Sequence, residues 1–130
     1  MKFEYTYTRL NVSNYQVSKK FYQDVLGFEV VYADDKSEYA ELATGETKIT
    51  LFNRQNLKDF VGVDEAVTYD AHYGGIMLSF RVANLDEAIA YLEAHGVEMV
   101  NQPIDFPYLG FISACFRDPD GNLIELQKLL

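Results

Sequence analysis

The chain has little of what many catalytic and metal sites are built from. Its 130 residues include one cysteine, Cys115, and two histidines. A lone cysteine excludes an internal disulfide, and no second cysteine or nearby histidine accompanies it to form a metal knuckle or a catalytic pair. We interpret Cys115 as a buried strand residue, with a reactive thiol as the alternative.

Long apolar runs are also missing. No stretch approaches the roughly 20 apolar residues that a membrane span needs. The N-terminal sequence MKFEYTYT alternates like a strand and lacks the apolar segment of a signal peptide. These absences predict a cytoplasmic protein that does not enter a membrane, of a length suited to one domain.

Positive charge is scarce and scattered. The 11 Lys and Arg residues stand against 20 Asp and Glu residues, which gives a formal net charge of −9. Such a chain would repel the phosphate backbone of a nucleic acid unless its basic residues were clustered. The sequence contains no cluster of basic residues. We therefore expect no nucleic-acid partner. Acidity would steer cationic small molecules, but it is also an ordinary feature of soluble proteins.

Aromatic residues, in contrast, are abundant. Ten Tyr and nine Phe exceed what the core of so small a domain needs. Because aromatic side chains supply large stackable surfaces, some of them are predicted to line a pocket for a small-molecule ligand.

The chain contains an internal twofold repeat. Residues 10–14 (LNVSN) align with residues 80–84 (FRVAN), and residues 27–31 (GFEVV) align with residues 96–100 (GVEMV). In each half a strand runs into an asparagine, an amphipathic segment, a glycine and further strands. The pattern predicts an α+β fold of two tandem βαβββ modules: module 1 at about 1–54, a linker at about 55–74 and module 2 at about 75–130.

Each module is predicted to hold one helix between an asparagine cap and a glycine. Asn14 and Asn84 occupy the N-cap positions, and Gly27 and Gly96 fit the C-terminal ends. The apolar stripes are formed by Val17, Phe21 and Val25 in the first helix and by Leu85, Ile89 and Leu92 in the second. Strands are expected at residues 28–32, 39–43, 48–52, 97–100, 112–117 and 123–128. The linker contains a short helical piece around residues 57–61 and is interpreted as a connection or a lid over a groove.

The C-terminal sequence FRDPDGNLIELQ, residues 116–127, predicts two strands joined by a tight turn. Pro119 presets φ in the turn and Gly121 supplies a positive φ. Asp118, Asp120 and Asn122 are assigned to the same turn geometry. The alternation after the turn places Glu125 on one face with Leu123 and Gln127, opposite to Ile124 and Leu126.

Together with TRLNVSNYQVSKKFYQDVLGFEVV at residues 8–31, this hairpin resembles the vicinal oxygen chelate superfamily, which includes glyoxalase I, extradiol dioxygenases, fosfomycin-modifying enzymes and bleomycin resistance proteins. The resemblance covers nearly the whole chain. It implies that the two modules form a curved mixed sheet around a groove. Relatives commonly pair two chains, so we expect a homodimer with an isologous twofold axis.

Strand alternation then predicts which side chains face the groove. Leu10 and Val12 lead into the helix and are assigned to the core, so their odd-numbered neighbours face the other way. The same parity applied to the other strands gives a mixed aromatic and polar set of ligand-binding candidates: Tyr5, Tyr7, Arg9, Thr50, Phe52, Met77, Ser79, Arg81, Phe111, Glu125 and Gln127.

The resemblance also places the metal-ligand positions of the superfamily at Tyr7, Thr50, Met77 and Glu125. Only Glu125 is a familiar ligand, because a phenol, a hydroxyl and a thioether are poor donors for the divalent ions that use His, Glu and Gln. His95 is interpreted as a helix-end residue and His72 as a loop residue. We expect no cofactor, with a divalent metal as the alternative.

Glu125 and the two arginines each have two interpretations. Glu125 is a candidate ligand contact or catalytic base; alternatively it rests in an ion pair with Arg9 or Arg81. Arg9 and Arg81 either clamp an anionic group such as a carboxylate, or pair with acidic neighbours such as Glu41.

The leading hypothesis is a metal-free small-molecule-binding protein of the bleomycin resistance type, with an aromatic or amphipathic ligand. The alternative is a metal-dependent lyase or dioxygenase of the same superfamily, in which Glu125 ligates the metal or moves a proton. A metal-free isomerase or epimerase that uses Glu125 and Tyr7 is a third hypothesis.

Overall fold

The computed structural model describes residues 1–2, 4–56 and 76–130. Contacts divide the chain into two units, Met1–Thr68 and Tyr69–Leu130, each of which is described on its own. The expected helical piece at residues 57–61, the lid and His72 lie outside the described residues. Within the described part no helix is long and apolar enough to cross a membrane.

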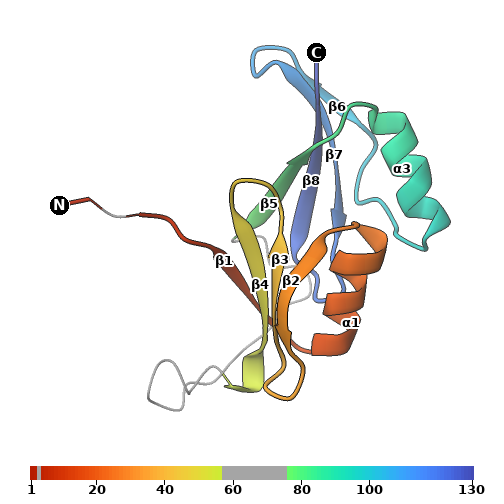
Figure 1. Ribbon diagram of the computed structural model, residues 1–130. Helices are drawn as coiled ribbons and strands as arrows, with labels where there is room; N and C mark the ends of the chain where they lie inside the picture. The colour runs from red at the N-terminus through yellow and green to blue at the C-terminus, as the bar shows by residue number, and fades with distance from the viewer. Residues whose placement is uncertain (3, 57–75) are drawn as a thin grey trace. The chain divides into compact units, whose positions relative to one another are not determined.

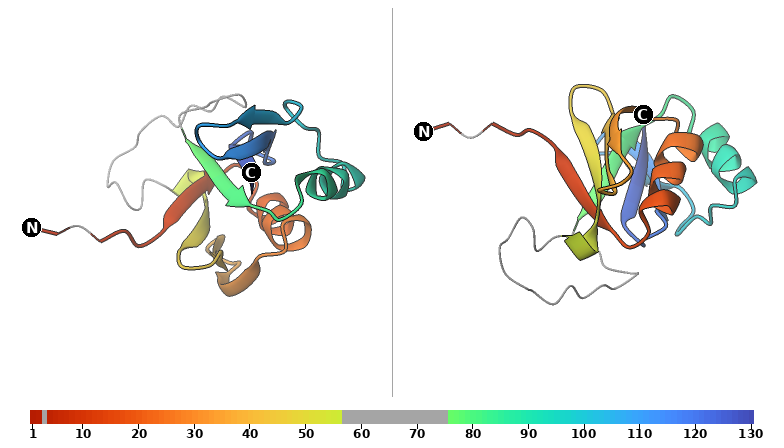
Figure 2. Two further views of the ribbon diagram at one scale, coloured as in Figure 1. Left: turned by 90° about the horizontal axis from the view of Figure 1, so that it is seen from above. Right: turned by 60° about the horizontal axis from the view of Figure 1, so that its bottom comes forward.

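Module 1 consists of a four-stranded mixed sheet with one helix on one side (Figures 1 and 2). The strand order is β1-β4-β3-β2, in which β1 and β4 are parallel and the other pairs antiparallel. Its elements are β1 (Thr8–Val12), α1 (Tyr15–Lys20), the π-helix η1 (Phe21–Val25), β2 (Glu29–Asp34), β3 (Tyr39–Ala43), β4 (Lys48–Asn53) and the 3-10 helix η2 (Arg54–Asn56).

Module 2 repeats this topology. Its strand order is β5-β8-β7-β6, with β5 and β8 parallel, and helix α3 lies on one side of the sheet (Figure 1). Its elements are β5 (Met77–Arg81), α3 (Leu85–Ala94), β6 (Ile104–Phe106), β7 (Phe111–Arg117) and β8 (Leu123–Leu129). The predicted α+β fold of two tandem βαβββ modules is confirmed.

The helix caps and glycines are where the sequence predicts them. Asn14 Oδ1 accepts a hydrogen bond from the Val17 amide at 3.1 Å, and Asn84 Oδ1 accepts one from the Glu87 amide at 3.0 Å. Such caps typically stabilise a helix by about 1 kcal/mol. Gly27 and Gly96 follow the helices at φ 76° and 81°, which only glycine adopts without strain.

The buried side of the first helix differs from the prediction. Val17 is 49% exposed, whereas Tyr15 and Tyr22 are 1% and 0% exposed. Ser18, which lies between the two tyrosines in the sequence, is also buried. Phe21 and Val25 are half-buried. The core stripe is therefore formed by Tyr15, Ser18 and Tyr22. A tyrosine can take this place because the Tyr15 hydroxyl finds a partner: it donates to Asp35 Oδ1 at 2.6 Å.

Two strand predictions also change. Residues 97–100 form no strand but an isolated bridge between Met99 and Phe116, and β6 comes later. The Asn101 side chain explains the break, because its Oδ1 accepts the Cys115 amide at 2.8 Å in place of a backbone carbonyl. Pro103 then removes a further backbone donor. At the N-terminus β1 begins at Thr8, whereas the strand-like alternation of residues 1–8 predicted an earlier start.

The predicted turn between β7 and β8 is confirmed. Asp118 Oδ1 accepts the amides of Asp120 and Asn122 at 2.9 and 2.8 Å, and Asp118 Oδ2 accepts Asn122 Nδ2 at 2.8 Å. Gly121 has φ 87° and donates its amide to the Asp118 carbonyl. These residues hold the hairpin, and their roles are structural.

The contact between Tyr15 and Asp35 predicts an acid-dependent change in stability. The Tyr15 hydroxyl and then Lys19, whose Nζ lies 3.0 Å from Asp35 Oδ1, hold the pKa of Asp35 below its ordinary value of 3.8. A lowered pKa in the folded state stabilises the protein above pH 4 or so, and this contribution is lost as pH falls through the folded-state pKa. Urea denaturation should show that Tyr15→Phe is destabilising at neutral pH and that the difference from wild type narrows in acid. A difference that grows in acid would contradict this assignment.

Candidate functional site

The sheet of each module has one face away from its helix, which we call the helix-free face. In module 1 the opposite face buries Leu10, Val12, Ala40, Leu42, Ile49 and Leu51. Strand pairing sets Arg9 beside Thr50 and Thr50 beside Glu41, so Thr50 stands at the centre of the helix-free face. By the same register the helix-free face of module 1 comprises Tyr7, Arg9, Asn11, Tyr39, Glu41, Ala43, Lys48, Thr50 and Phe52.

Arg9 lies among three aromatic rings of this face. Its guanidinium carbon is 5.6 Å from the ring centroid of Tyr7, 5.6 Å from that of Tyr39 and 5.2 Å from that of Phe52. Arg9 Nη2 also donates to the Tyr7 hydroxyl at 3.2 Å. The three distances to the ring centroids are within the range of cation–π attraction, so the rings hold the guanidinium on the sheet.

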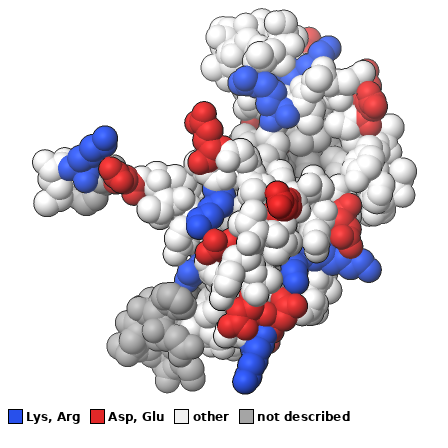
Figure 3. All heavy atoms as spheres, in the orientation of Figure 1, with Lys and Arg blue, Asp and Glu red and all other residues white. Residues whose placement is uncertain are grey.

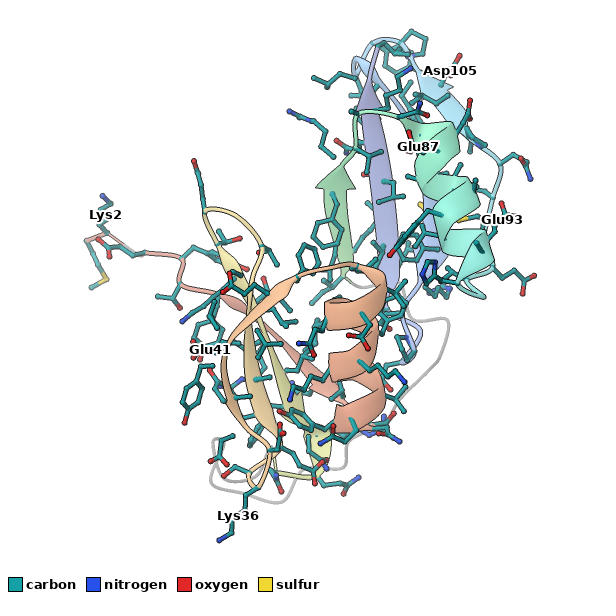
Figure 4. The ribbon with its side chains drawn as sticks, turned by 45° about the vertical axis from the view of Figure 1, so that its right-hand side comes forward. Lys2, Lys36, Glu41, Glu87, Glu93 and Asp105 are labelled. Atoms are coloured by element: carbon teal, nitrogen blue, oxygen red, sulfur yellow. The ribbon has the colours of Figure 1, made fainter. Side chains whose placement is uncertain are left out.

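Glu41, labelled in Figure 4, has both carboxylate oxygens engaged. Oε2 accepts the Tyr39 hydroxyl at 2.6 Å, and Oε1 lies 3.0 Å from Lys48 Nζ. The Tyr39 hydrogen bond and then Lys48 lower the pKa of Glu41, while burial and then Glu41 raise the pKa of Tyr39 to about 12. At neutral pH Glu41 is therefore ionised and Tyr39 is protonated. Lys48 Nζ also lies 5.8 Å from the Tyr7 ring centroid.

This face includes buried polar atoms of uncharged side chains that lack a hydrogen-bond partner among the described residues. They are Thr50 Oγ1 and Asn11 Oδ1. Thr50 is 0% exposed. A buried hydroxyl without a partner costs free energy, which marks Thr50 as an unusual residue at the centre of the face.

An open depression borders the same face at its Lys48 end. It has a volume of about 290 Å³ and is lined by Thr6, Val31, Ala43, Gly45, Glu46, Thr47 and Lys48. Its size is near the lower end of the range for small-molecule sites. Ala43 and Lys48 belong to both surfaces, so the depression continues the helix-free face of module 1.

Glu125 occupies in module 2 the place that Thr50 occupies in module 1. It lies between Ser79 on β5 and Cys115 on β7, and it is 9% exposed. Ser79 Oγ donates to Glu125 Oε1 at 2.6 Å, and Gln127 Nε2 donates to the same oxygen at 2.7 Å. Glu125 Oε2 accepts no hydrogen bond from the residues that the structure describes. The two donors fix the carboxylate and leave Oε2 for a ligand.

Cys115 and Arg81 both lie on the helix-free face of module 2. Burial and then the charge of Glu125 raise the pKa of the Cys115 thiol, which disfavours a reactive thiolate. Cys115 is a strand residue as predicted, but it is half-buried on the helix-free face and not fully buried. Arg81 is exposed and forms no ion pair with Glu125 within residues 76–130. Of the two predicted resting pairs of Glu125, with Arg9 or with Arg81, the second is not formed among the described residues of module 2, where Ser79 and Gln127 are the hydrogen-bond partners of Glu125.

The remaining predicted site residues fall on the two helix-free faces, with one exception. Tyr5 lies before β1, is 69% exposed and forms a hydrogen bond with the Thr8 hydroxyl. The candidates on the face of module 1 are Tyr7, Arg9, Thr50 and Phe52, and those on the face of module 2 are Met77, Ser79, Arg81, Phe111, Glu125 and Gln127. The sequence-based set missed Tyr39, Glu41 and Lys48. These three residues alternate along β3 and β4 in the same way as Thr50 and Phe52. The sequence alone did not show how the two strands pair, so it did not place them beside Thr50.

The side chains at the four superfamily ligand positions do not fit a divalent cation. The Tyr7 hydroxyl accepts a hydrogen bond from Arg9, and two cations, Arg9 and Lys48, lie within 6 Å of its ring centroid. Thr50 supplies a neutral hydroxyl and Met77 a thioether, so Glu125 is the one carboxylate in the set. No group of three or more His, Cys, Asp or Glu side chains suited to a metal occurs in residues 1–2, 4–56 and 76–130.

This chain belongs to the Glyoxalase/Bleomycin resistance protein/Dioxygenase superfamily, whose model matches residues 5–126. It is 35% identical over 122 residues to the uncharacterized protein YraH of Bacillus subtilis, covering 94% of this chain and 95% of YraH. It is 30% identical over 120 residues to catechol-2,3-dioxygenase of the same organism, covering 92% of this chain but 39% of the dioxygenase. A solved glyoxalase/bleomycin resistance protein/dioxygenase from Nocardioides has the same fold, with a TM-score of 0.79 at 21% identity, over 100% of this chain and 87% of the other.

Proposed function

We propose that this chain binds a small aromatic or amphipathic molecule at the helix-free face of each module and that it does so without a resident metal ion. The observation that carries the proposal is the arrangement of Tyr7, Tyr39 and Phe52 around Arg9. Rings at this spacing offer stacking surfaces to a flat ligand. Of these residues Tyr7 stands at a position where the superfamily places a metal ligand, and a phenol held by Arg9 favours a binding surface over a metal centre.

The helix-free face of module 2 supplies a different kind of contact. Glu125 Oε2 is a fixed acceptor for a ligand hydroxyl or amine, because Ser79 and Gln127 both hold Oε1. Met77, 44% exposed, adds an apolar contact on the same face. Such a surface recognises a molecule that has both apolar area and hydrogen-bond donors.

Removing one ring from the face of module 1 should weaken binding. Tyr7 is 36% exposed, so its ring can contact a ligand while it packs against Arg9. Loss of one stacking partner should lower affinity by about twofold to tenfold, since aromatic pairs contribute about 0.5–1.5 kcal/mol. The measurement is isothermal titration of chelator-treated Tyr7→Ala with a compound found in a thermal-shift screen of aromatic acids, amides, phenols and antibiotics.

Tyr108→Ala is the matched control, because Tyr108 is a 91% exposed tyrosine in the turn between β6 and β7. Its affinity should equal that of the wild type. Equal affinities for Tyr7→Ala and the wild type would remove Tyr7 from the site. Binding or turnover that appears only with an added divalent ion would favour the metal-dependent lyase or dioxygenase instead.

A further inference from the structure

We propose that the helix-free face of module 2 binds a ligand with two polar groups, a hydrogen-bond donor that contacts Glu125 and an oxyanion that contacts Arg81. The inference rests on the proposed function and names its ligand class: hydroxyaryl carboxylates and similar amphipathic molecules that carry both groups on one apolar frame. The formal net charge of −9 does not predict this class, because acidity by itself favours a cation.

Arg81 is an exposed cation at one end of this face. It is the last residue of β5 and lies beside Gln127 in the register with β8. Its side chain forms no hydrogen bond or ion pair with the residues that the structure describes. The N–H groups of a guanidinium form a planar fork that matches the two oxygens of a carboxylate. Arg81 can therefore receive an oxyanion without breaking a contact of module 2.

The carboxylate of this face is held by neutral donors. Glu125 Oε1 accepts Ser79 Oγ at 2.6 Å and Gln127 Nε2 at 2.7 Å. Gln127 lies beside Arg81 in the register, so an amide engages the carboxylate where a guanidinium could have done so. Glu125 keeps its second oxygen for a ligand donor, and Arg81 keeps its charge for a ligand oxyanion.

The spacing of the two charges suits one ligand that spans both. Arg81 and Glu125 are one strand and two residues apart in the register of β5 and β8. Strands lie about 4.8 Å apart and rise about 3.3 Å per residue, so the two Cα atoms are about 8 Å apart. A further cation of this face, Arg117, lies toward the other end of β8 and donates Nη1 to the Gly121 carbonyl at 2.8 Å.

Apolar side chains on the same face favour an aryl frame for this ligand. Met77 on β5 is 44% exposed, and Leu129, which follows Gln127 on the same face of β8, is 53% exposed. Phe111 lies beside Leu129 in the register and is half-buried. A ring system gains apolar contact here that a small hydrophilic zwitterion does not.

The test separates the two polar groups on one frame. Chelator-treated wild-type protein is titrated by calorimetry with 6-hydroxy-2-naphthoate, with 2-naphthoate and with 2-naphthol. We expect the hydroxynaphthoate to bind at least about threefold more tightly than either of the others, a modest factor because Arg81 is exposed. In Arg81→Met the advantage over 2-naphthol should disappear. In Glu125→Gln the advantage over 2-naphthoate should shrink, because the acceptor loses its charge.

Lys128→Met is the matched control. Lys128 is an exposed cation on β8, and its place next to Gln127 puts it on the other face of the sheet. It should retain both advantages, and their loss in this variant would overturn the assignment to Arg81, as would an advantage over 2-naphthol that survives in Arg81→Met. If 6-hydroxy-2-naphthoate and 2-naphthol bind the wild type equally well, the inference is overturned and the proposed function stands. If none of the three binds, both are contradicted.

Discussion

Phe116→Ala should destabilise the protein by about 3–5 kcal/mol, the range for removing a large aromatic side chain from a packed core. Phe116 is 0% exposed on β7 and lies opposite Ile124, which is also 0% exposed. Its side chain faces the helix side of the sheet, since Cys115 and Glu125 stand on the other face. Urea denaturation followed by circular dichroism measures the free energy of unfolding.

Phe111→Ala on the same strand is the matched control. Phe111 is half-buried, stands on the helix-free face and packs against Phe106 at a centroid distance of 5.6 Å. Its loss should cost about 1–2 kcal/mol, in proportion to the smaller area removed from water. Equal losses for the two variants would contradict the assignment of faces. If Phe116→Ala does not fold, Phe116→Leu gives the same comparison at lower cost.

Glu125→Ala should lower ligand affinity by about tenfold to a hundredfold, because hydrogen bonds to charged groups contribute about 1.5–3 kcal/mol. The carboxylate is fixed by Ser79 and Gln127, so its free oxygen is aligned before the ligand arrives. Titration of the chelator-treated variant with the compound that binds the wild type measures the change. Glu125→Gln, which preserves shape but removes the charge, should show an intermediate loss.

Glu87→Ala serves as the control for Glu125→Ala. Glu87 is an exposed glutamate in the first turn of α3 (Figure 4), the helix on the side of the sheet opposite to the helix-free face that carries Glu125. The formal charge of the protein changes by the same amount in both variants. If the two variants bind the ligand equally well, Glu125 has no part in recognition.

Local chemistry made much of the fold predictable. Asn14, Asn84, Gly27 and Gly96 act on the helix ends within a few residues of themselves. The turn at residues 118–122 is likewise held by its own side chain and backbone. Such signals need no knowledge of the tertiary structure.

The errors have long-range causes. Burial of Tyr15 depends on Asp35, 20 residues away, so helical periodicity alone favoured Val17. The strand expected at residues 97–100 is interrupted because Asn101 bonds with Cys115 on a different strand. Neither contact can be derived from local sequence pattern.

The candidate site could be predicted only in part. Strand parity placed Arg9 and Thr50 on one face, since alternation is a local property. The neighbours Tyr39 and Lys48 required the pairing of β3 with β4, and Ser79 as a partner of Glu125 required the pairing of β5 with β8. On the visible surface acidic and basic side chains are interspersed (Figure 3), so surface charge alone does not single out the surroundings of Arg9.

Elemental analysis of the untagged protein, combined with ligand titration before and after chelation, tests the central claim most directly. We expect no stoichiometric divalent ion and an affinity for the aromatic ligand that chelation leaves unchanged. Nickel, zinc, manganese, iron(II) and magnesium should then produce no thermal shift. A stoichiometric ion that stabilises the wild type, and whose effect is lost in Glu125→Ala, would contradict the account and identify a metal-dependent member of the superfamily.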